Sequence, residues 1–224
     1  MNPTEIMNPK EMIARRVALE VKSGTMVNLG IGLPSMVANY LPEGVDVFFQ
    51  AENGMIGLGA RPPEGMEEED LTDAGAGFVT AVPGAASIDS AMSFGLIRGG
   101  HLDMTVLGGL QVDERGFLAN WKVPGKMVPG MGGAMDLVAG AKRVIVAMIH
   151  TVKGKNPKIV PECTLPLTAT RRVSLIVTEM AVIEPTETGL VLRETAPGVT
   201  VDDVRAATAA KLLVDGDVRE MALG

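Results

Sequence analysis

The sequence predicts an α/β fold in which a mixed, largely parallel sheet is covered by helices. The first observation behind this prediction is that short apolar runs typical of strands alternate along the chain with segments that begin as helices do. The second is that the runs TMVNL (25–29) and RVIVAMI (143–149) are apolar at most positions. A strand with one wet face would alternate with polar residues, so these runs indicate a sheet that is buried on both faces.

The first element is predicted to be a helix over about residues 9–23. Asn8 is a favourable N-cap, Pro9 suits the first helical position, and apolar residues then recur at every fourth position. Gly24 follows the pattern as a usual helix end. These signals together predict one amphipathic helix at the start of the fold.

The remaining elements follow the same alternation of strand-like and helix-like segments. Besides 25–29 and 143–149, strands are predicted at Val45–Gln50, Met104–Leu107, Val173–Thr178 and Leu190–Glu194, and helices at about 34–41, 87–97, 133–140 and 202–212. Strand-like runs are denser in the last third of the chain, which favours an antiparallel portion there. The acidic segment RPPEGMEEED (61–70) is expected to be an exposed loop.

Length and composition limit the class of protein. With 224 residues, 46% of them apolar, we expect one domain over 1–224 with a mobile tail at about 215–224. The 20 basic and 27 acidic residues give a net charge of −7, which argues against nucleic-acid binding. No apolar run is long enough to predict a transmembrane helix. The single cysteine, Cys163, excludes an internal disulfide and favours a reducing compartment, so we expect a cytoplasmic protein.

Three glycine-rich stretches follow predicted strands: NLGIGLPS (28–35), AENGMIGLG (51–59) and PGMGGAMD (129–136). Such turns present backbone N–H groups at the carboxyl ends of strands, where open α/β sheets bind their ligands. None of them is a complete GxGxxG fingerprint, and the chain has no Walker A lysine motif. Dinucleotide and nucleoside-triphosphate sites are therefore disfavoured.

Glu52 is the candidate catalytic residue, because it directly follows the apolar run VDVFFQA and precedes Asn53 and Gly54. An ionisable side chain on a tight turn after a buried strand is expected to project into the cleft at the end of the sheet. The alternative is a glutamate that caps a helix or forms a surface ion pair. Glutamate side chains are ionised at neutral pH, so Glu52 would need no base to act as a nucleophile.

Other catalytic patterns are missing from the sequence. There is no GxSxG elbow, and His101 and His150 lack the spacing of a metal-binding HExxH motif. We expect His101 to be a structural hydrogen-bonding residue and Cys163 to be a small buried apolar residue. No metal site is predicted.

Several longer strings make the chain resemble the β subunit of class I CoA-transferases, in particular the acetate/butyrate–acetoacetate and succinyl-CoA:3-oxoacid types. The resemblance covers about residues 8–214 and rests on VNLGIGLPSMVANYLPEG, QAENGMIGLG, SFGLIRGGHLDMTVLGGLQVDERGFLANW, VPGKMVPGMGGAMDLV and ECTLPLT. The string ENGMIG matches the family's ExGxxG pattern, whose glutamate is the covalent nucleophile. The resemblance therefore implies that Glu52 is that nucleophile.

The same resemblance implies which residues contact CoA. The family's positions match Asn28 in the NLGIG turn, Asn120 in the ANW segment, and Gly133 with Ala134 in GMGGAMD. The sequence departs from the usual pattern at Ala51, where the family commonly has serine, and in AGAGFVT (74–80). The first departure matters little, whereas the second leaves local CoA contacts and acyl preference undetermined.

The resemblance further implies the architecture and the assembly. The fold would be of the CoA-transferase/ribose-5-phosphate isomerase type, made from two similar halves that are separate chains in bacterial members. This chain would pair with an α subunit as αβ or α2β2, with the site at the junction and an apolar patch exposed on the isolated β subunit.

The implied reaction is a ping-pong transfer of CoA between a short-chain acyl-CoA or 3-oxoacyl-CoA and a free carboxylic acid, through a glutamyl-CoA thioester. The CoA thioester is a substrate, and neither a cofactor nor a metal is implied. Backbone N–H groups of the NLGIG turn and of Gly133 are candidate donors to the oxyanion. Lys122 or Lys126 is a candidate contact to a CoA phosphate, and solvated loop lysines are the equal alternative.

Two other functions remain open from the sequence. A CoA-thioester hydrolase on the same scaffold would use water in place of the acceptor carboxylate, and would turn over acyl-CoA without added acid. A ligand-binding domain without catalysis would tolerate the loss of Glu52, but it gives no reason for the match to CoA-contacting motifs.

Overall fold

The computed structural model describes residues 7–125, 130–152 and 156–224. Their helices are α1 (Pro9–Ala18), the 3-10 helix η1 (Pro34–Tyr40), α2 (Ser90–Arg98), α3 (Ala134–Gly140) and α4 (Val201–Ala207). Their strands are β1 (Thr25–Leu29), β2 (Val47–Gln50), β3 (Met55–Leu58), β4 (Ala81–Ser87), β5 (Met104–Leu107), β6 (Gln111–Asp113), β7 (Leu118–Ala119), β8 (Arg143–Ala147), β9 (Thr151–Val152), β10 (Asn156–Pro157), β11 (Ile159–Val160), β12 (Leu175–Val177), β13 (Ala181–Thr186), β14 (Gly189–Thr195), β15 (Leu212–Leu213) and β16 (Arg219–Glu220).

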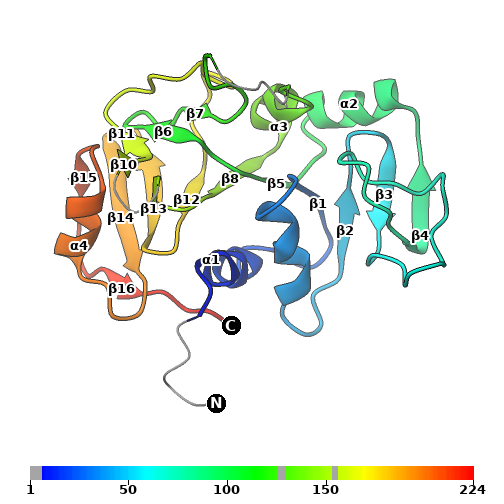
Figure 1. Ribbon diagram of the computed structural model, residues 1–224, viewed down its shortest axis with the longest axis horizontal. Coiled ribbons are helices and arrows are strands. Elements are labelled where there is room, and N and C mark those ends of the chain that lie inside the picture. The colour runs from blue at the N-terminus through cyan, green and yellow to red at the C-terminus, as the bar shows by residue number, and fades with distance from the viewer. Residues whose placement is uncertain (1–6, 126–129, 153–155) are drawn as a thin grey trace.

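One large mixed sheet organises the molecule, in the order β15-β14-β13-β12-β8-β5-β1-β2-β3-β4, with β16 beside β14. The five central strands from β12 to β2 are parallel, whereas β13 pairs antiparallel with β12, and β14 pairs antiparallel with β13. Figure 1 shows α2 and α3 on one side of this sheet, with α1 and η1 on the other. The predicted α/β class with a largely parallel sheet is confirmed, as is the antiparallel portion near the C-terminus.

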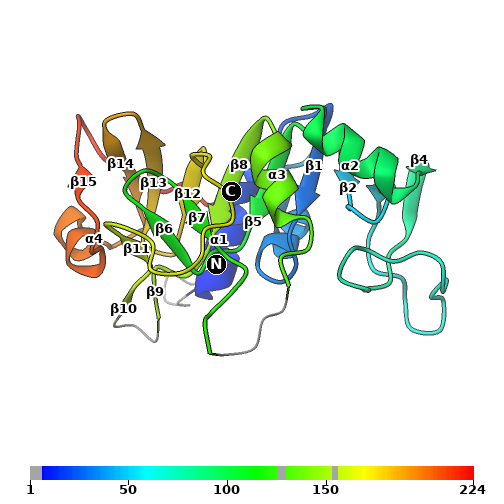
Figure 2. The same ribbon diagram turned by 90° about the horizontal axis from the view of Figure 1, so that it is seen from above.

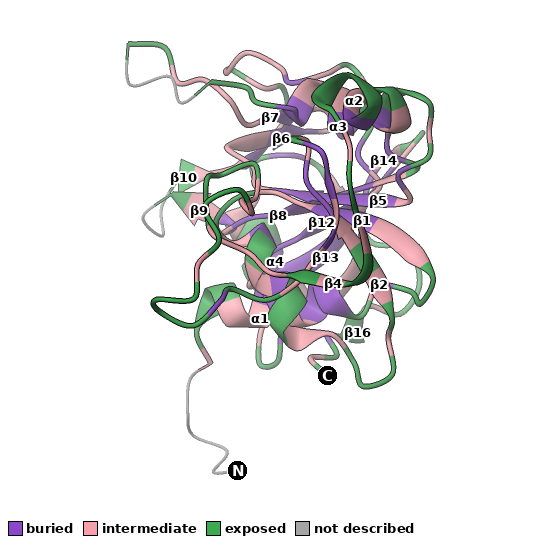
Figure 3. Ribbon diagram, turned by 90° about the vertical axis from the view of Figure 1, so that its right-hand side faces the viewer, coloured by how far each residue is buried: buried purple, intermediate pink, exposed green. Residues whose placement is uncertain are grey.

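The central strands β12, β8, β5 and β1 send side chains into two separate apolar cores. In β8, Val144 and Val146 join the core that includes Leu137 of α3, whereas Ile145 joins the core that includes Ile13 of α1. Burial on both faces explains why these strands are apolar at most positions, since each such side chain contributes about 1.5–3 kcal/mol when buried. Figure 3 shows the same result, with the buried colour concentrated in the central strands.

Three helices differ from their predicted extents. The helix predicted at about 202–212 ends at Ala207, because the backbone of Thr208 is extended. The first helix ends at Ala18 instead of near residue 23, because Glu20 and Val21 bond to carbonyls only three residues back and tighten the chain. Val21 is still buried, in the core that packs against α1. Its place in the apolar pattern therefore indicates burial, and not a continuation of the helix. The helix expected at about 87–97 begins at Ser90, because Asp89 accepts from Met92 N and caps it.

The β3–β4 arm was not predicted from the sequence. Strand β4 has the sequence AVPGAAS and is the edge strand of the large sheet, with most of its residues exposed. Proline, glycine and alanine are poor strand formers, and an edge strand needs no apolar face, so the segment lacked a strand signal. The excursion between β3 and β4 contains residues 61–70, which are mostly exposed as expected. Figure 2 shows this excursion extending away from the rest of the fold.

The C-terminal tail packs on the sheet over part of its length. The segment Arg219–Glu220 pairs with β14, and Met221 is buried in the α1 core. We expected a mobile tail at about 215–224, and these contacts instead place residues 219–221 within the fold. Among the described residues, no helix is both long and apolar enough to cross a membrane.

His150 is a buried histidine that predicts how stability depends on pH. Its ring nitrogens Nδ1 and Nε2 lie 2.9 and 2.8 Å from the hydroxyls of Thr178 and Thr208. Burial, with a smaller contribution from the charge of Lys158, lowers the pKa of His150 to about 4. The unfolded chain therefore binds this proton more readily than the folded chain. The corresponding stability is present above pH 6.5 and is lost as the pH falls through about 4.

Between pH 7 and 4, we expect the free energy of unfolding to fall by about 3 kcal/mol less in His150→Gln than in the unmodified chain. Urea denaturation followed across this range measures the effect. His101→Gln, which makes the same chemical change at an exposed histidine, is the matched control. Equal slopes for His150→Gln and the unmodified chain would contradict this assignment.

Candidate active site

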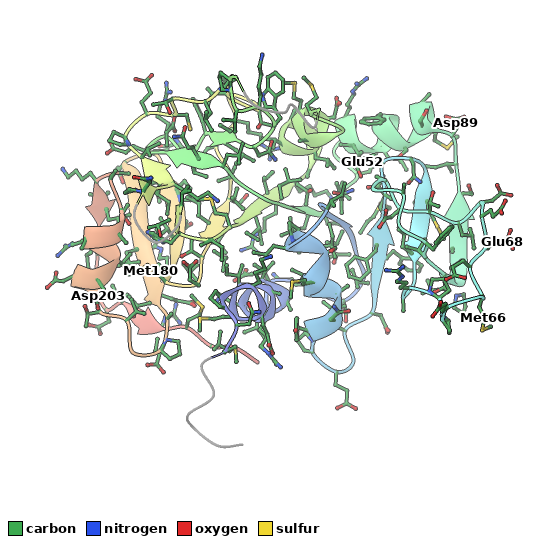
Figure 4. All side chains as sticks on the ribbon, in the orientation of Figure 1. Glu52, Met66, Glu68, Asp89, Met180 and Asp203 are labelled. Atoms are coloured by element: carbon green, nitrogen blue, oxygen red, sulfur yellow. The ribbon has the colours of Figure 1, made fainter. Side chains whose placement is uncertain are left out.

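Glu52 lies in the tight turn between β2 and β3, at the carboxyl end of the parallel strands (Figure 4). The turn is closed by hydrogen bonds from Ala51 N to Met55 O at 2.8 Å and from Gly54 N to Ala51 O at 3.0 Å. Gly54 has a φ of 121°, and a Cβ there would collide with the carbonyl oxygen of Ile88 just before α2. The turn is therefore held against the N-terminus of α2, and it presents a half-buried Glu52 side chain.

Asn28 is the direct partner of the Glu52 carboxylate. Its Nδ2 donates a hydrogen bond of 3.0 Å to Glu52 Oε2. Asn28 is near the end of β1, and only 1% of its surface is exposed. The structure thus brings together two of the predicted site residues, which are 24 positions apart.

Gly133 lies against the other side of the same carboxylate. A Cβ at this position would be 2.8 Å from both Cγ and Oε1 of Glu52. Gly133 has φ −83° and ψ 3°, in the bridge region that non-glycine residues also occupy, so the backbone does not require glycine here. The missing side chain instead leaves the space that the Glu52 carboxylate occupies.

The two remaining predicted residues, Ala134 and Asn120, lie at the same end of the sheet, and their hydrogen bonds go to residues other than Glu52. Ala134 begins α3, and its N–H donates to Met131 O at 3.1 Å. Asn120 donates from Nδ2 to Gly108 O at 3.2 Å and accepts from the Thr168 hydroxyl at 2.7 Å. Gly108 directly follows β5, the neighbour of β1, so Asn120 is fixed at the carboxyl ends of the central strands.

One of the expected backbone donors is already occupied. In the NLGIG turn, Gly30 N donates to Val106 O at 2.8 Å, which joins the turn to β5. Its N–H is therefore not the donor that faces Glu52.

Three polar residues next to the carboxylate were missed in the sequence analysis: Gln50 in β2, Ser93 in α2 and Thr105 in β5. At most 3% of each is exposed, and each belongs to a hydrogen-bonded network that reaches Asn28. For Gln50 and Thr105, the signal in the sequence was a polar residue in the otherwise apolar strands VFFQ and MTVL. Without the strand order, that signal does not distinguish a site from a solvated position.

Apolar side chains are exposed around the same turn. We define the apolar rim as Ile31 after β1, Met92 in α2 and Met131 before α3, which are 76%, 55% and 37% exposed. The departure at residues 74–80 is adjacent to this rim, because a Cβ on Gly75 would lie 3.0 Å from the Ile31 side chain. Large exposed apolar groups around a polar centre are typical of a surface that a partner or ligand covers.

The other residues considered from the sequence lie outside this centre. His101 is exposed, and the hydrogen bond that it makes comes from its main-chain N–H to Leu96 O rather than from its ring. Cys163 is half-buried rather than fully buried, and burial raises the pKa of its thiol to about 12, which disfavours a thiolate nucleophile. The Lys122 ammonium lies 5.7 Å from the centroid of the Trp121 ring, and Lys126 lies outside the described residues.

The family follows from comparison with known proteins. The family model described as coenzyme A transferase matches residues 10–207. The chain belongs to the coenzyme A transferase family. The beta subunit of the acetate CoA-transferase of Haemophilus influenzae is 54% identical over 96% of both chains. The B subunit of the succinyl-CoA:3-ketoacid coenzyme A transferase of Helicobacter pylori is 48% identical over 92% of this chain and 99% of that one.

A solved coenzyme A transferase has the same fold. The acyl-CoA transferase apoenzyme of Escherichia coli O157:H7 superposes with a TM-score of 0.77 and 25% identity. The alignment covers 96% of this chain, which spans 43% of the length of that protein. Among the described residues, no group of three or more His, Cys, Asp or Glu is arranged to hold a metal ion.

Proposed function

We propose that this chain is the glutamate-bearing subunit of a two-subunit CoA-transferase, in which Glu52 forms a covalent glutamyl-CoA thioester. The observation that supports this role is the position of the Glu52 carboxylate at the carboxyl ends of the parallel strands. There it accepts a hydrogen bond from the Asn28 amide and fills the space left by the missing side chain of Gly133. A positioned, half-buried carboxylate with one fixed donor is suited to act as a nucleophile.

In the first half-reaction, a carboxylate oxygen of Glu52 attacks the thioester carbonyl of an acyl-CoA. The C–S bond breaks, and the products are an acyl–glutamyl anhydride and CoA thiolate. The thiolate then attacks the side-chain carbonyl carbon of Glu52, the bond to the anhydride oxygen breaks, and the acyl group departs as a free carboxylate. An incoming carboxylate reverses these steps and leaves as the new acyl-CoA. The anhydride keeps the acyl group activated, and the thioester keeps the Glu52 carbonyl activated, which a serine ester or a lysine amide would not do.

Asn28 has a specific task in this scheme. Attack on the Glu52 side-chain carbonyl places negative charge on its oxygen, and the Asn28 Nδ2 donor is already 3.0 Å from Oε2. A donor fixed in this way contributes about 3–4 kcal/mol to an oxyanion-like transition state. Asn28 is too buried to hold the remote parts of CoA, so its contact with CoA is confined to the thioester end. The Gly133 N–H remains a candidate donor to the oxyanion. Gly133, Ala134 and Asn120 remain candidate contacts to CoA, and Lys122 or Lys126 remains a candidate contact to a CoA phosphate.

The anhydride and the thioester must be protected from water, which explains a need for a second subunit. The apolar rim of Ile31, Met92 and Met131 is exposed on the segments that follow β1, begin α2 and precede α3, and its covering by another chain would close the site. The bacterial relatives are named as beta or B subunits, which supports pairing of this chain with an α subunit as αβ or α2β2.

The substrates are proposed to be short acyl-CoA or 3-oxoacyl-CoA esters and small carboxylic acids. The relatives' names include both acetate and succinyl-CoA:3-ketoacid transferases, so they support the short-chain class. The CoA thioester is a substrate in this scheme, and no step requires a metal or another cofactor. Cytoplasmic location remains part of the proposal.

Trapping the intermediate tests the proposal. The two-subunit enzyme is incubated with acetoacetyl-CoA alone, and the intact mass of each subunit is measured separately. We expect this chain to gain the mass of CoA less one water. Borohydride reduction should then convert Glu52, and no other residue, to the corresponding alcohol. An adduct on the partner subunit, or on another residue of this chain, would overturn the assignment.

The same preparation separates a transferase from a hydrolase. A transferase consumes acyl-CoA beyond one equivalent only when acetate or another acceptor acid is added. Steady turnover without any acceptor would favour the hydrolase.

A further inference from the structure

Three polar residues form a row across neighbouring strands beside Glu52. Thr105 of β5, Asn28 of β1 and Gln50 of β2 are in register with one another. In the next strand, β8, the position in register with Thr105 is Val144, which belongs to the apolar core. The polar row is therefore confined to β5, β1 and β2, and it ends at the strand that leads into the Glu52 turn.

The hydrogen bonds along this row have a defined direction. The Thr105 hydroxyl donates to Asn28 Oδ1 at 3.2 Å, which leaves Asn28 Nδ2 for acceptors on the opposite side. Those acceptors are Glu52 Oε2 at 3.0 Å, together with the main-chain and side-chain oxygens of Gln50 at 3.0 and 3.2 Å. If the amide rotated by half a turn, Oδ1 would face three acceptor oxygens, which is unfavourable.

The far end of the row is fixed by α2. Gln50 Nε2 donates to the Ser93 hydroxyl at 2.8 Å and to Ala51 O at 2.9 Å, so Gln50 Oε1 must point toward Asn28. Oxygens that only accept, Glu52 Oε2 for Asn28 and Ala51 O for Gln50, thus set the orientation of the two amides, and the hydroxyls at both ends complete their hydrogen bonds. A buried polar row gains little net stability over apolar packing, because burial removes hydration that the hydrogen bonds only replace. Its orienting effect is what an apolar row could not supply.

We propose that Thr105 is a positioning residue for the transfer reaction: its hydroxyl holds the Asn28 amide in the orientation that donates to Glu52. This inference rests on the proposed role of Glu52. Thr105 is fully buried, so it acts through Asn28 and not by contact with substrate.

The test compares Thr105→Val, which keeps the shape and removes the hydroxyl, with Thr105→Ser, which keeps the hydroxyl and removes the methyl group. The two-subunit enzyme is mixed with acetoacetyl-CoA, quenched at set times, and assayed for the glutamyl-CoA adduct by intact mass. We expect Thr105→Val to slow adduct formation about tenfold. The half-saturating substrate concentration should change less than about twofold, since no substrate contact is removed. Thr105→Ser should restore most of the rate.

An Asn28→Ala background shows whether the effect passes through Asn28. In that background Thr105→Val should cause no further slowing, because the amide that it orients is gone. Equal slowing in both backgrounds, failure of Thr105→Ser to recover, or a full rate for Thr105→Val would each overturn the inference. Thermal unfolding of each variant checks that the fold persists.

Failure of the inference can be told apart from failure of the proposed function. If the unmodified enzyme forms no adduct at Glu52, the proposed function fails and the role of Thr105 fails with it. If the unmodified enzyme forms the adduct and Thr105→Val forms it equally fast, only the inference fails.

Discussion

Replacing Glu52 with glutamine is expected to abolish CoA exchange while leaving the fold intact. An amide oxygen is a poor nucleophile and cannot form the anhydride, so the covalent route is lost rather than slowed by a missing contact. We expect the exchange rate of the two-subunit enzyme to fall by at least about 10³-fold. The carbonyl oxygen of the introduced glutamine could still accept from Asn28, so the thermal midpoint should change little.

The matched control is Glu68→Gln, which makes the same chemical change in the exposed loop between β3 and β4. It should retain full activity. Slow deamidation of glutamine would restore Glu52, so the mass of the variant is checked before and after the assay. If Glu52→Gln exchanged CoA at the full rate with deamidation excluded, Glu52 would not be the nucleophile.

Local sequence patterns were sufficient to predict the central sheet. Strands β1 and β5 match their predicted ranges, because both are buried on two faces and end at glycines. The β13 strand was not predicted, although it is apolar and buried, and its sequence AVIEPT includes a proline, which is unfavourable inside a sheet. Pairing with β12 and β14 overrides that local preference.

Only part of the candidate site was predicted, because local patterns do not show which strands are neighbours. Glu52 could be identified because it is an ionisable residue on a turn after an apolar run. Its contact with Asn28 depends on β1 and β2 being neighbours in the sheet, and apolar periodicity contains no information on strand order. The resemblance to a known family supplied Asn28 and Gly133, but it did not supply Gln50, Ser93 or Thr105. Those residues act on each other across strands and become visible only with the register.

Gly133→Ala is expected to reduce CoA exchange strongly although it adds only a methyl group. The new Cβ would be 2.8 Å from Cγ and Oε1 of Glu52, and these atoms belong to a side chain that can swing away. The backbone at Gly133 accepts alanine without strain, so the folded state should lose little stability. Instead, we expect the Glu52 carboxylate to move away and to leave its position beside Asn28.

A reacting group that moves by about 1 Å can lose about 10²-fold in rate, and we expect a loss of that order in the rate of glutamyl-CoA formation. The control is Gly95→Ala in α2, where an added Cβ meets no atom within 4 Å. Alanine in a helix is favoured over glycine by up to about 1 kcal/mol, so this variant should be as active and slightly more stable.

A Gly133→Ala enzyme that forms the adduct at the normal rate would mean that the carboxylate reacts from a different position. A variant that is inactive because it is unfolded would instead show that Gly133 is needed for the start of α3. Normal thermal unfolding with slow adduct formation is the combination that assigns Gly133 to the space for Glu52.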